Sequence, residues 1–495
     1  MIRRLLLGLL AIVLLLAAAL TANTLRQGSR QAQVAPLAAL AVDKEAASAH
    51  LAEAVRLKTV SSETDPSLNR DQFEQLHALL QARYPQAHAV LQRERVGELS
   101  LFYTWRGSDP TAPGILLMAH HDVVPIAPGT EQAWSVEPFS GIVKDGYVWG
   151  RGTWDDKGNL IAQMEAIELL AKAGFKPRRT IYLVSGADEE VGGHRGAERI
   201  AAMLQQRGVR LEFVIDEGMV ITDGLVPGLR PPAAIVGVAE KGYLSARLKI
   251  DTAPGHSSMP PPPASSVIAL MAAALQRIDA QRMPARIGGV AREMFTTLAP
   301  EMDGFLRLAF SNLWLFGPLV QPKLEAVPST NALLRTTTAL TMVHAGNKEN
   351  VLPGVAEATI NFRLLPGDTS AGVLERTRAQ VSAAIGTGKF ELTAAPGGSE
   401  ATPISPTDSA AYQLLQRTIR EIFPGVVVAP GLYLAGSDST HFLALSNNVF
   451  RFSPVHVTPQ DVGRLHGTNE RISVDNLADL IRFYHRLLTT GAQAS

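Results

Sequence analysis

The sequence predicts an α/β fold in which a main domain, with a mixed, mostly parallel sheet flanked by helices, carries an inserted α+β domain. In the first 240 residues, short apolar runs typical of buried strands alternate with segments of helical spacing. From about residue 241, apolar and polar residues alternate as in a half-exposed antiparallel strand. The α/β character returns after Gly397 and Gly398, so the middle stretch is interpreted as an insertion.

The individual elements follow from local periodicity. Helical spacing occurs at 47–59, 73–84, 160–173, 409–422 and 474–488. Buried-strand runs occur at 114–119, 180–185 and 211–215, and alternating strands at 243–251, 336–343 and 356–364. These elements place the main domain at 43–240 and 399–495, the inserted domain at 241–398 and a tether at 26–42.

The first 25 residues carry an export signal. Arg3 and Arg4 precede an uncharged, strongly apolar stretch that runs to Leu25, as in a signal anchor or a signal peptide. The stretch exceeds the usual signal core of about 7–15 residues, and a cleavage site ending at Ala22 has Leu20 where Ala is preferred. A retained single-span anchor is therefore favoured over a cleaved signal. In both cases the bulk of the chain lies outside the cytoplasm, membrane-anchored or else secreted or periplasmic.

Composition excludes several classes of function. Among 495 residues, Lys+Arg and Asp+Glu both number 46, so the basic excess expected of a nucleic-acid-binding protein is missing. The chain contains no cysteine, which excludes disulfides, thiol catalysis and thiolate metal sites. Any transition metal must be held by His, Asp and Glu side chains.

Acidic residues and histidines gather where the predicted buried strands end. They are His120, His121 and Asp122, the pairs Asp155–Asp156 and Asp216–Glu217, the run Asp188–Glu190, and the late His466. Taken singly, each group is more typical of a surface turn or a helix start than of a site. Together they are expected to converge, because ligands of α/β sheets bind at the carboxyl ends of the strands. Adjacent acids repel one another unless a cation compensates, so the set predicts a dinuclear site with two zinc ions about 3.5–4 Å apart.

Six motifs in chain order resemble those of one enzyme family. They are HxDVVP at 120–125, GRGTWDDKG at 150–158, DEE at 188–190, DEG at 216–218, GHSS at 255–258 and HGTNE at 466–470. The set resembles the co-catalytic zinc peptidases that include aminoacylase, glutamate carboxypeptidase, acetylornithine deacetylase and carboxypeptidase S. The N-terminal apolar segment and the DEG wording are most similar to carboxypeptidase S and its secreted relatives that act on N-fatty-acyl amino acids.

The resemblance implies a role for each matched position in a catalytic zinc domain. It makes Asp155 the bridging ligand of two Zn²⁺ per subunit, with a cis peptide bond to Asp156, and it allows Co²⁺ or Mn²⁺ as substitutes. The remaining ligands are His120 and Asp216 for one ion, and Glu190 and His466 for the other. Glu189 is expected to be the general base, and Asp122 is expected to orient His120.

The inserted domain is expected to serve as a lid and to form a homodimer. In the family that the motifs resemble, the equivalent of His256 hydrogen-bonds the tetrahedral oxyanion, commonly in the neighbouring subunit. Asn350 and Arg363 suit a substrate carboxylate through charge-assisted hydrogen bonds. Gly436 lies in a loop similar to the family's C-terminal glycine loop, whose backbone contacts the same carboxylate.

These features predict zinc-dependent hydrolysis of an amide bond next to a free α-carboxylate, in a short peptide or an N-acyl amino acid. One alternative is a non-catalytic binding relative, which would require the loss of ligands or base. Another is an aminopeptidase of the same clan, but Asn350 and Arg363 favour a carboxylate over a free amine. No nucleic acid is expected as a partner, and the membrane is contacted only through the N-terminal segment.

Two further groups of residues need an interpretation. His121, His194 and the group Ser437, Asp438 and His441 are not expected to be ligands or a serine triad, since triads do not assemble from residues so close in sequence. The apolar segment 283–328 has three interpretations, which the sequence leaves open: a channel for a long acyl or bulky hydrophobic group, a membrane-packing surface, or a contact with a partner subunit.

Overall fold

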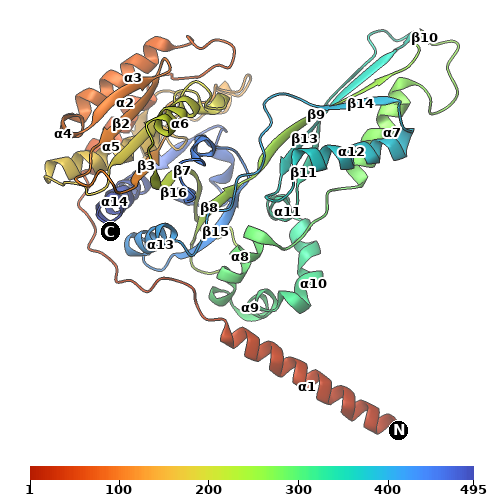
Figure 1. The fold of residues 1–495 in the computed structure, drawn as a ribbon, viewed down its shortest axis with the longest axis horizontal. Helices are drawn as coiled ribbons and strands as arrows, with labels where there is room; N and C mark the ends of the chain where they lie inside the picture. The colour runs from red at the N-terminus through yellow and green to blue at the C-terminus, as the bar shows by residue number, and fades with distance from the viewer. Residues whose placement is uncertain (495) are drawn as a thin grey trace.

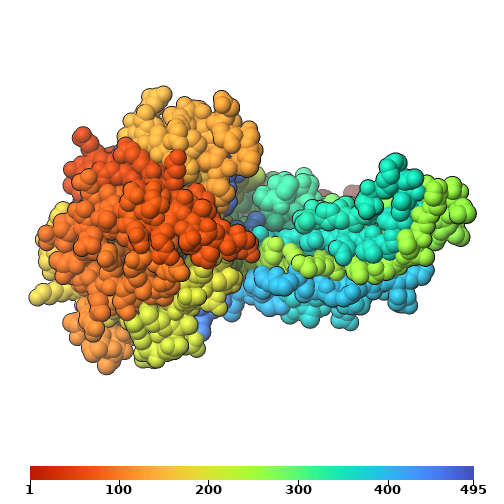
Figure 2. Space-filling model, turned by 90° about the horizontal axis from the view of Figure 1, so that it is seen from above, coloured from red at the N-terminus to blue at the C-terminus, as the bar shows by residue number. Residues whose placement is uncertain are grey.

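The computed structural model describes residues 1–494, which form a larger and a smaller lobe joined by a narrower waist (Figure 2). The larger lobe is built on an eight-stranded sheet of order β1-β2-β6-β3-β7-β16-β8-β15. Its strands are β1 (Gln92–Val96), β2 (Ser100–Trp105), β3 (Gly114–Met118), β6 (Ile181–Ser185), β7 (Leu211–Thr222), β8 (Ala233–Glu240), β15 (Val427–Tyr433) and β16 (Val449–Val457). The pairs β6–β3, β3–β7 and β7–β16 are parallel, whereas β1–β2 and β2–β6 are antiparallel, which confirms a mixed sheet.

Helices cover both faces of this sheet because successive strand residues point to opposite sides. Leu101 of β2 and Leu117 of β3 pack with one layer of helices, whereas Phe102 and Leu116 pack with α6 (Ala197–Gln206) on the other side. The first layer comprises α2 (Lys44–Val55), α3 (Arg70–Arg83), α4 (Pro85–Val90), α5 (Lys157–Lys172), α13 (Ala410–Ile422) and α14 (Val474–Gly491). The strands predicted as buried on both faces are confirmed.

A small three-stranded sheet ties together two segments that are distant in sequence. Its order is β17-β5-β4, with β4 (Ile142–Lys144), β5 (Tyr147–Trp149) and β17 (Arg471–Ser473). Pairing of Arg471 with Trp149 places the loop after β5 beside the loop before β17. These loops carry the GRGTWDDKG and HGTNE motifs.

The smaller lobe is an antiparallel sheet of order β11-β13-β9-β14 with helices on one face. Its elements are β9 (Gly242–Asp251), β11 (Thr337–Ala345), β13 (Val355–Leu364), β14 (Phe390–Ala394), α7 (Val267–Ala280) and α12 (Ser370–Ile385). A two-stranded arm of β10 (Gly255–His256) and β12 (Val351–Leu352) lies at its far end in Figure 1.

The apolar segment 283–328 contributes to four helices, α8 (Gly289–Leu298), α9 (Gly304–Ser311), α10 (Leu313–Glu325) and α11 (Pro328–Leu334). It falls within the stretch predicted as the inserted domain, yet its side chains pack with Ile235 of β8 and Ala429 of β15 in the larger lobe. The N-terminal helix α1 (Ile2–Arg26) is long and apolar enough to cross a membrane, and it projects from the body beside α9 (Figure 1).

Candidate metal centre and active site

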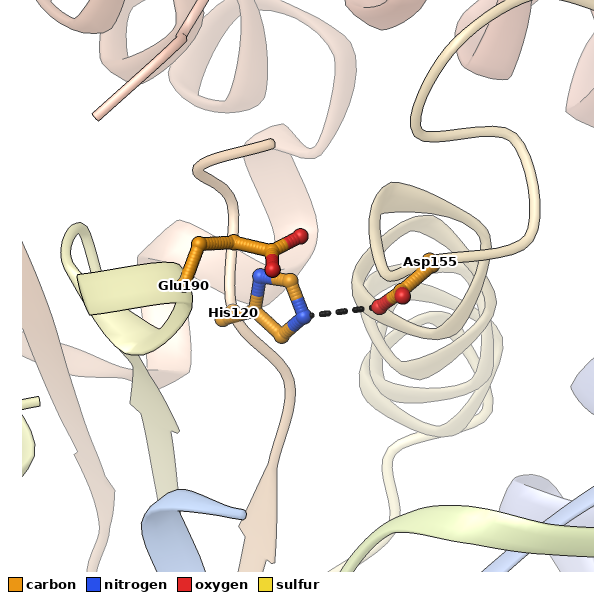
Figure 3. Close-up of side chains that lie close together, drawn as sticks. All are labelled: His120, Asp155 and Glu190. Atoms are coloured by element: carbon orange, nitrogen blue, oxygen red, sulfur yellow. Dashed lines mark hydrogen bonds and ion pairs between the residues drawn. The ribbon is translucent and has the colours of Figure 1, made fainter. Parts of the chain in front are cut away.

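Asp155 lies between two histidines that are distant in sequence. It precedes α5, and one of its carboxylate oxygens, Oδ1, is 2.9 Å from Nε2 of His120, which follows β3 (Figure 3). Its other oxygen, Oδ2, is 2.9 Å from Nε2 of His466, which comes from the loop before β17. The two oxygens therefore face two different imidazoles, an arrangement that suits a carboxylate shared by two cations. The peptide bond between Asp155 and Asp156 is cis, as the resemblance implied.

Glu190 completes one group of converging donor atoms. It lies in the turn after β6, and its Oε2 is 3.3 Å from Nε2 of His466. Ligand atoms of His120, Asp155 and Glu190 all lie within 4.8 Å of one another. Oε1 of Glu190 is buried and has no hydrogen-bond partner among residues 1–494, so this oxygen is free to bind a cation.

A second group brings Glu217, rather than Asp216, toward His120. Ligand atoms of His120, Asp156 and Glu217 lie within 4.8 Å of one another, and Oε1 of Glu217 is 3.6 Å from Nε2 of His120. Asp216 is in neither group, and its two oxygens accept hydrogen bonds from the backbone N–H of Glu217 and of Ser439. In the structure, Glu217 rather than Asp216 therefore belongs to a donor group with His120.

Burial and mutual repulsion set the electrostatics of the centre. Burial raises the pKa of Glu189, Glu190 and Glu217 above the ordinary glutamate value. Hydrogen bonds to Asp155 and Glu190 raise the pKa of His466 to about 10. The raised pKa values mean that bound protons offset part of the negative charge of the clustered carboxylates. Imidazole and carboxylate donors that require such compensation fit a pair of divalent cations.

Asp122 links the segment after β3, which carries His120, to the turn after β6, which carries Glu189 and Glu190. Its Oδ1 is 3.3 Å from Nδ1 of His120, whose Nε2 faces Asp155. Its two oxygens also accept hydrogen bonds from the backbone N–H groups of Glu189 and Glu190, each at 3.2 Å. The predicted orienting residue therefore contacts both the histidine and the turn that carries Glu189.

A buried ion pair, which sequence reasoning missed, joins the two loops that meet at the small sheet. Glu470 accepts a hydrogen bond from Arg151 at 2.6 Å and from the backbone N–H of Asp155 at 3.2 Å. Arg151 in turn donates to the backbone oxygens of His466 and Gly467, each at 3.1 Å. The pair fixes Asp155 relative to His466. Its signals in the sequence are Arg151 within the GRGTWDDKG motif and the acid at the end of the HGTNE motif.

The loop that contains Gly436 is anchored next to the centre. Ser437 donates to Glu240 from its backbone N–H and from its hydroxyl, and Glu240 also accepts from the buried Arg451 at 2.8 Å. Gly436 itself is exposed. The structure places this predicted substrate-contacting backbone at the end of β15.

The predicted lid residues occupy two separate places in the smaller lobe. His256 is exposed on the far arm, beside Asn350, whose backbone oxygen accepts from the N–H of Ser257. Arg363 lies at the other end of β13, where its guanidinium stacks over Tyr243 at 4.8 Å. Because β13 has ten residues at about 3.4 Å each, Asn350 and Arg363 of one chain are too far apart to hold the same carboxylate.

The residues excluded as ligands lie outside both donor groups. Buried His121 contacts Ser185 and His77, and exposed His194 pairs with Glu198. His441 contacts the backbone oxygen of Gly192, while Ser437 bonds to Glu240. In the described residues, the hydrogen bonds of Ser437 and His441 thus do not form a serine triad.

Comparisons with known proteins identify the family. The family model described as peptidase family M20/M25/M40 matches residues 116–490. The N-fatty-acyl-amino acid synthase/hydrolase PM20D1 of Xenopus tropicalis is 42% identical over 439 residues, covering 88% of this chain and 84% of that protein. Carboxypeptidase S of Saccharomyces cerevisiae is 31% identical over 487 residues, covering 88% of this chain and 83% of that protein.

Solved structures share the fold. An M20 family metallo-carboxypeptidase from Sulfolobus solfataricus aligns with a TM-score of 0.62 at 17% identity, covering 91% of this chain and 99% of that chain. Human carnosine dipeptidase 1 also aligns with a TM-score of 0.62, at 16% identity, covering 91% and 97%. The chain belongs to the peptidase family M20/M25/M40 and is a hydrolase of amide bonds.

Proposed function

We propose that this enzyme uses two Zn²⁺ ions, held by His120, Asp155, Glu190, Glu217 and His466, to hydrolyse N-acyl amino acids. The main support for this proposal is that the two carboxylate oxygens of Asp155 lie 2.9 Å from Nε2 of His120 and from Nε2 of His466, respectively. Glu217 takes the place of Asp216 in the proposed ligand set, because Glu217 belongs to a donor group with His120 and its Oε1 is 3.6 Å from Nε2 of His120. When bound, such a metal pair acidifies water and polarises an amide carbonyl.

Glu189 is proposed as the general base. It is adjacent to the ligand Glu190, its backbone is fixed by Asp122, and it belongs to neither donor group, which leaves its carboxylate available for a proton. Burial raises its pKa, which brings a carboxyl group closer to the operating pH and makes it a more effective proton acceptor. Glu189 takes a proton from the attacking water and delivers it to the leaving amine.

The substrate assignment combines the relatives with the lid residues. The more similar relative is named as an N-fatty-acyl-amino acid synthase/hydrolase, and the more distant one as a carboxypeptidase. Both names describe substrates that carry a free carboxylate, for which Arg363 is the proposed partner. A carboxypeptidase acting on short peptides is the second candidate, supported by the 31% identity to carboxypeptidase S.

A substrate screen tests this proposal. N-acyl amino acids, dipeptides and the carboxamides of both are offered to wild-type enzyme and to Arg363→Ala. We expect wild type to prefer N-acyl amino acids with a free carboxylate, and Arg363→Ala to raise KM for them at least tenfold while changing the carboxamides little. Equal effects on acids and carboxamides would contradict the role of Arg363, and a preference for dipeptides would favour the second candidate.

A homodimer through the smaller lobe is proposed because it reunites the separated lid residues. His256 and Asn350 share the far arm, so a partner chain can bring both to the site while Arg363 comes from the same chain as the metal ligands. Within the described part of the chain, strand β11 lies at the edge of its sheet with one side unpaired, and it exposes Leu340, Met342 and Val343, which are 42, 54 and 57% exposed. Exposed apolar edges of this kind are surfaces for pairing with another chain.

Mixing variants tests the contribution from the partner. His256→Ala is expected to lower kcat about 10²–10³-fold with metal retained, as expected for loss of an oxyanion donor. Mixed with Glu189→Gln, it should regain activity, because one site of the heterodimer then has both Glu189 and a partner's His256. A mixture that stays as inactive as its two components would contradict action across the dimer.

The N-terminal helix is proposed to be a retained anchor, with the enzyme outside the cytoplasm. Its exposed part is apolar, and its last turns contact α9 through Asn23, whose side chain donates to the backbone oxygen of Ser311 at 2.8 Å. Asn312 donates to Thr24 at 2.9 Å. These contacts fix the end of the helix against the enzyme.

A further inference from the structure

The helical segment that packs against the larger lobe encloses an apolar cavity that the hydrolytic site does not use. Helices α8 to α11 and strands β7, β8 and β15 surround a space of about 700 Å³. Small-molecule sites measure about 300–1,000 Å³, whereas well-packed cores leave few voids larger than a water molecule. A space of this size is therefore larger than a packing defect and large enough to hold a small molecule.

The lining specifies the chemistry of the occupant. Most of the wall is aliphatic or aromatic, with Phe295, Leu298, Ala309, Phe310 and Leu324 among its side chains. Among the described residues of the wall, Lys323 alone carries a charge. Polar groups cost free energy when they are buried without hydrogen bonds, so this wall selects a hydrocarbon group.

The inner end of the cavity adjoins the metal centre. Met219, which lines it, lies two residues beyond Glu217 on β7, and Leu432 of the lining immediately precedes Tyr433 on β15. The two strands touch here, since a methyl group at Gly218 would lie 3.4 Å from the ring of Tyr433. A chain attached to an amide at the centre would have to pass between the side chains at this contact to reach the cavity.

The outer end lies near the N-terminal helix. The lining residues Phe305 and Leu319 are 64 and 66% exposed and mark the mouth between α9 and α10. Helix α9 also contacts the C-terminal end of α1, and the rest of α1 projects away from the enzyme in Figure 1. The mouth thus opens near the apolar anchor, where amphiphiles gather when that helix is in a membrane.

We propose that this cavity binds the long hydrocarbon chain of an acylated substrate and so sets the preference for acyl-chain length. This inference rests on the proposed function, because it assigns the acyl part of the same substrate. Of the three interpretations left open for segment 283–328, it selects the acyl channel. Each CH₂ group of the acyl chain that the cavity buries contributes about 0.8 kcal/mol of binding free energy. Each added CH₂ group should therefore raise kcat/KM about fourfold.

Filling the cavity tests the proposal. Ala309 lines the space and is fully buried, so Ala309→Trp places an indole inside it. We expect kcat/KM for an N-hexadecanoyl amino acid to fall at least tenfold, with the N-acetyl analogue within twofold of wild type. Binding of cis-parinaric acid to the full-length protein, followed by its fluorescence, should weaken by the same order. Equal losses for both substrates, or unchanged binding of the probe, would overturn the proposal.

A second variant and a control separate the outcomes. Leu319→Glu adds a charge at the exposed mouth, where folding tolerates it, and should also weaken binding of the probe; unchanged binding would contradict occupation of this end of the cavity by the hydrocarbon chain. Trp314→Ala changes a side chain on the same helix that is 61% exposed and does not line the cavity, and it should alter neither readout. If wild type hydrolyses neither substrate yet binds the probe, the proposed function fails while the cavity assignment stands.

Discussion

Replacing Glu189 by Gln is expected to lower kcat by about 10²–10⁴-fold while leaving the metal content unchanged. The amide matches the carboxylate in size but cannot accept the proton of the attacking water. Retention of the metal follows from the geometry, because Glu189 is in neither group of converging donor atoms. The backbone N–H that bonds to Asp122 is also unchanged, so the turn that carries Glu190 should keep its position.

Turnover and metal content of purified Glu189→Gln are measured together, by kinetics and by elemental analysis. Glu198→Gln is the matched control, since Glu198 is an exposed glutamate whose partner is the exposed His194. The control should behave as wild type. Loss of metal from Glu189→Gln would identify Glu189 as a ligand, and retained turnover would remove it as the base.

The convergence of distant residues was predictable because it depends on topology alone. Parallel strands end at one edge of a sheet, and β3 and β6 are adjacent there, so His120 and Glu190 had to meet. The ion pair that joins the loops of Asp155 and His466 was not predictable. It uses Arg151 and Glu470, a buried pair whose partners are 319 residues apart and whose bond appears only once β17 pairs with β5.

The choice between Asp216 and Glu217 could not be made from the sequence. Adjacent residues of a strand face opposite sides, so either acid could face the centre. The register of β7 with β16 shifts between Asp216 and Met219, which breaks the alternation at this point. The resulting turn of the backbone directs Asp216 to the N–H of Ser439 and leaves Glu217 beside His120.

Spacing in sequence does not determine how far apart the predicted lid residues lie. Asn350 and Arg363 are thirteen positions apart, which suggested a shared substrate carboxylate. The extended β13 separates them to its two ends within a chain, so their joint action requires the proposed dimer. In the same way, composition identified segment 283–328 as apolar but could not specify that it packs on β8 and β15 rather than on the smaller sheet.

Removing the metal with a chelator is expected to abolish turnover and to lower the melting temperature, by an amount that grows as the pH rises. At a free metal concentration 1,000-fold above Kd, binding stabilises the folded state by about 4.1 kcal/mol, and removal forfeits this. In the metal-free protein, the pKa of Asp216 is raised to about 6 by burial, and that of His466 to about 10 by its carboxylate partners. Both groups, and the buried glutamates, then bind more protons when folded than when unfolded.

A folded state that binds more protons than the unfolded state loses stability as the pH rises. For His466 this loss extends from its ordinary value of 6.5 up to about 10. Metal binding has the opposite dependence, because it requires deprotonated ligands. The difference in melting temperature between metal-loaded and stripped protein should therefore be smallest in mild acid and increase through neutral to alkaline pH. Zinc added back should restore both turnover and stability, whereas full turnover in the stripped protein, or a difference that shrinks with rising pH, would show that these carboxylates and histidines do not hold the catalytic metal.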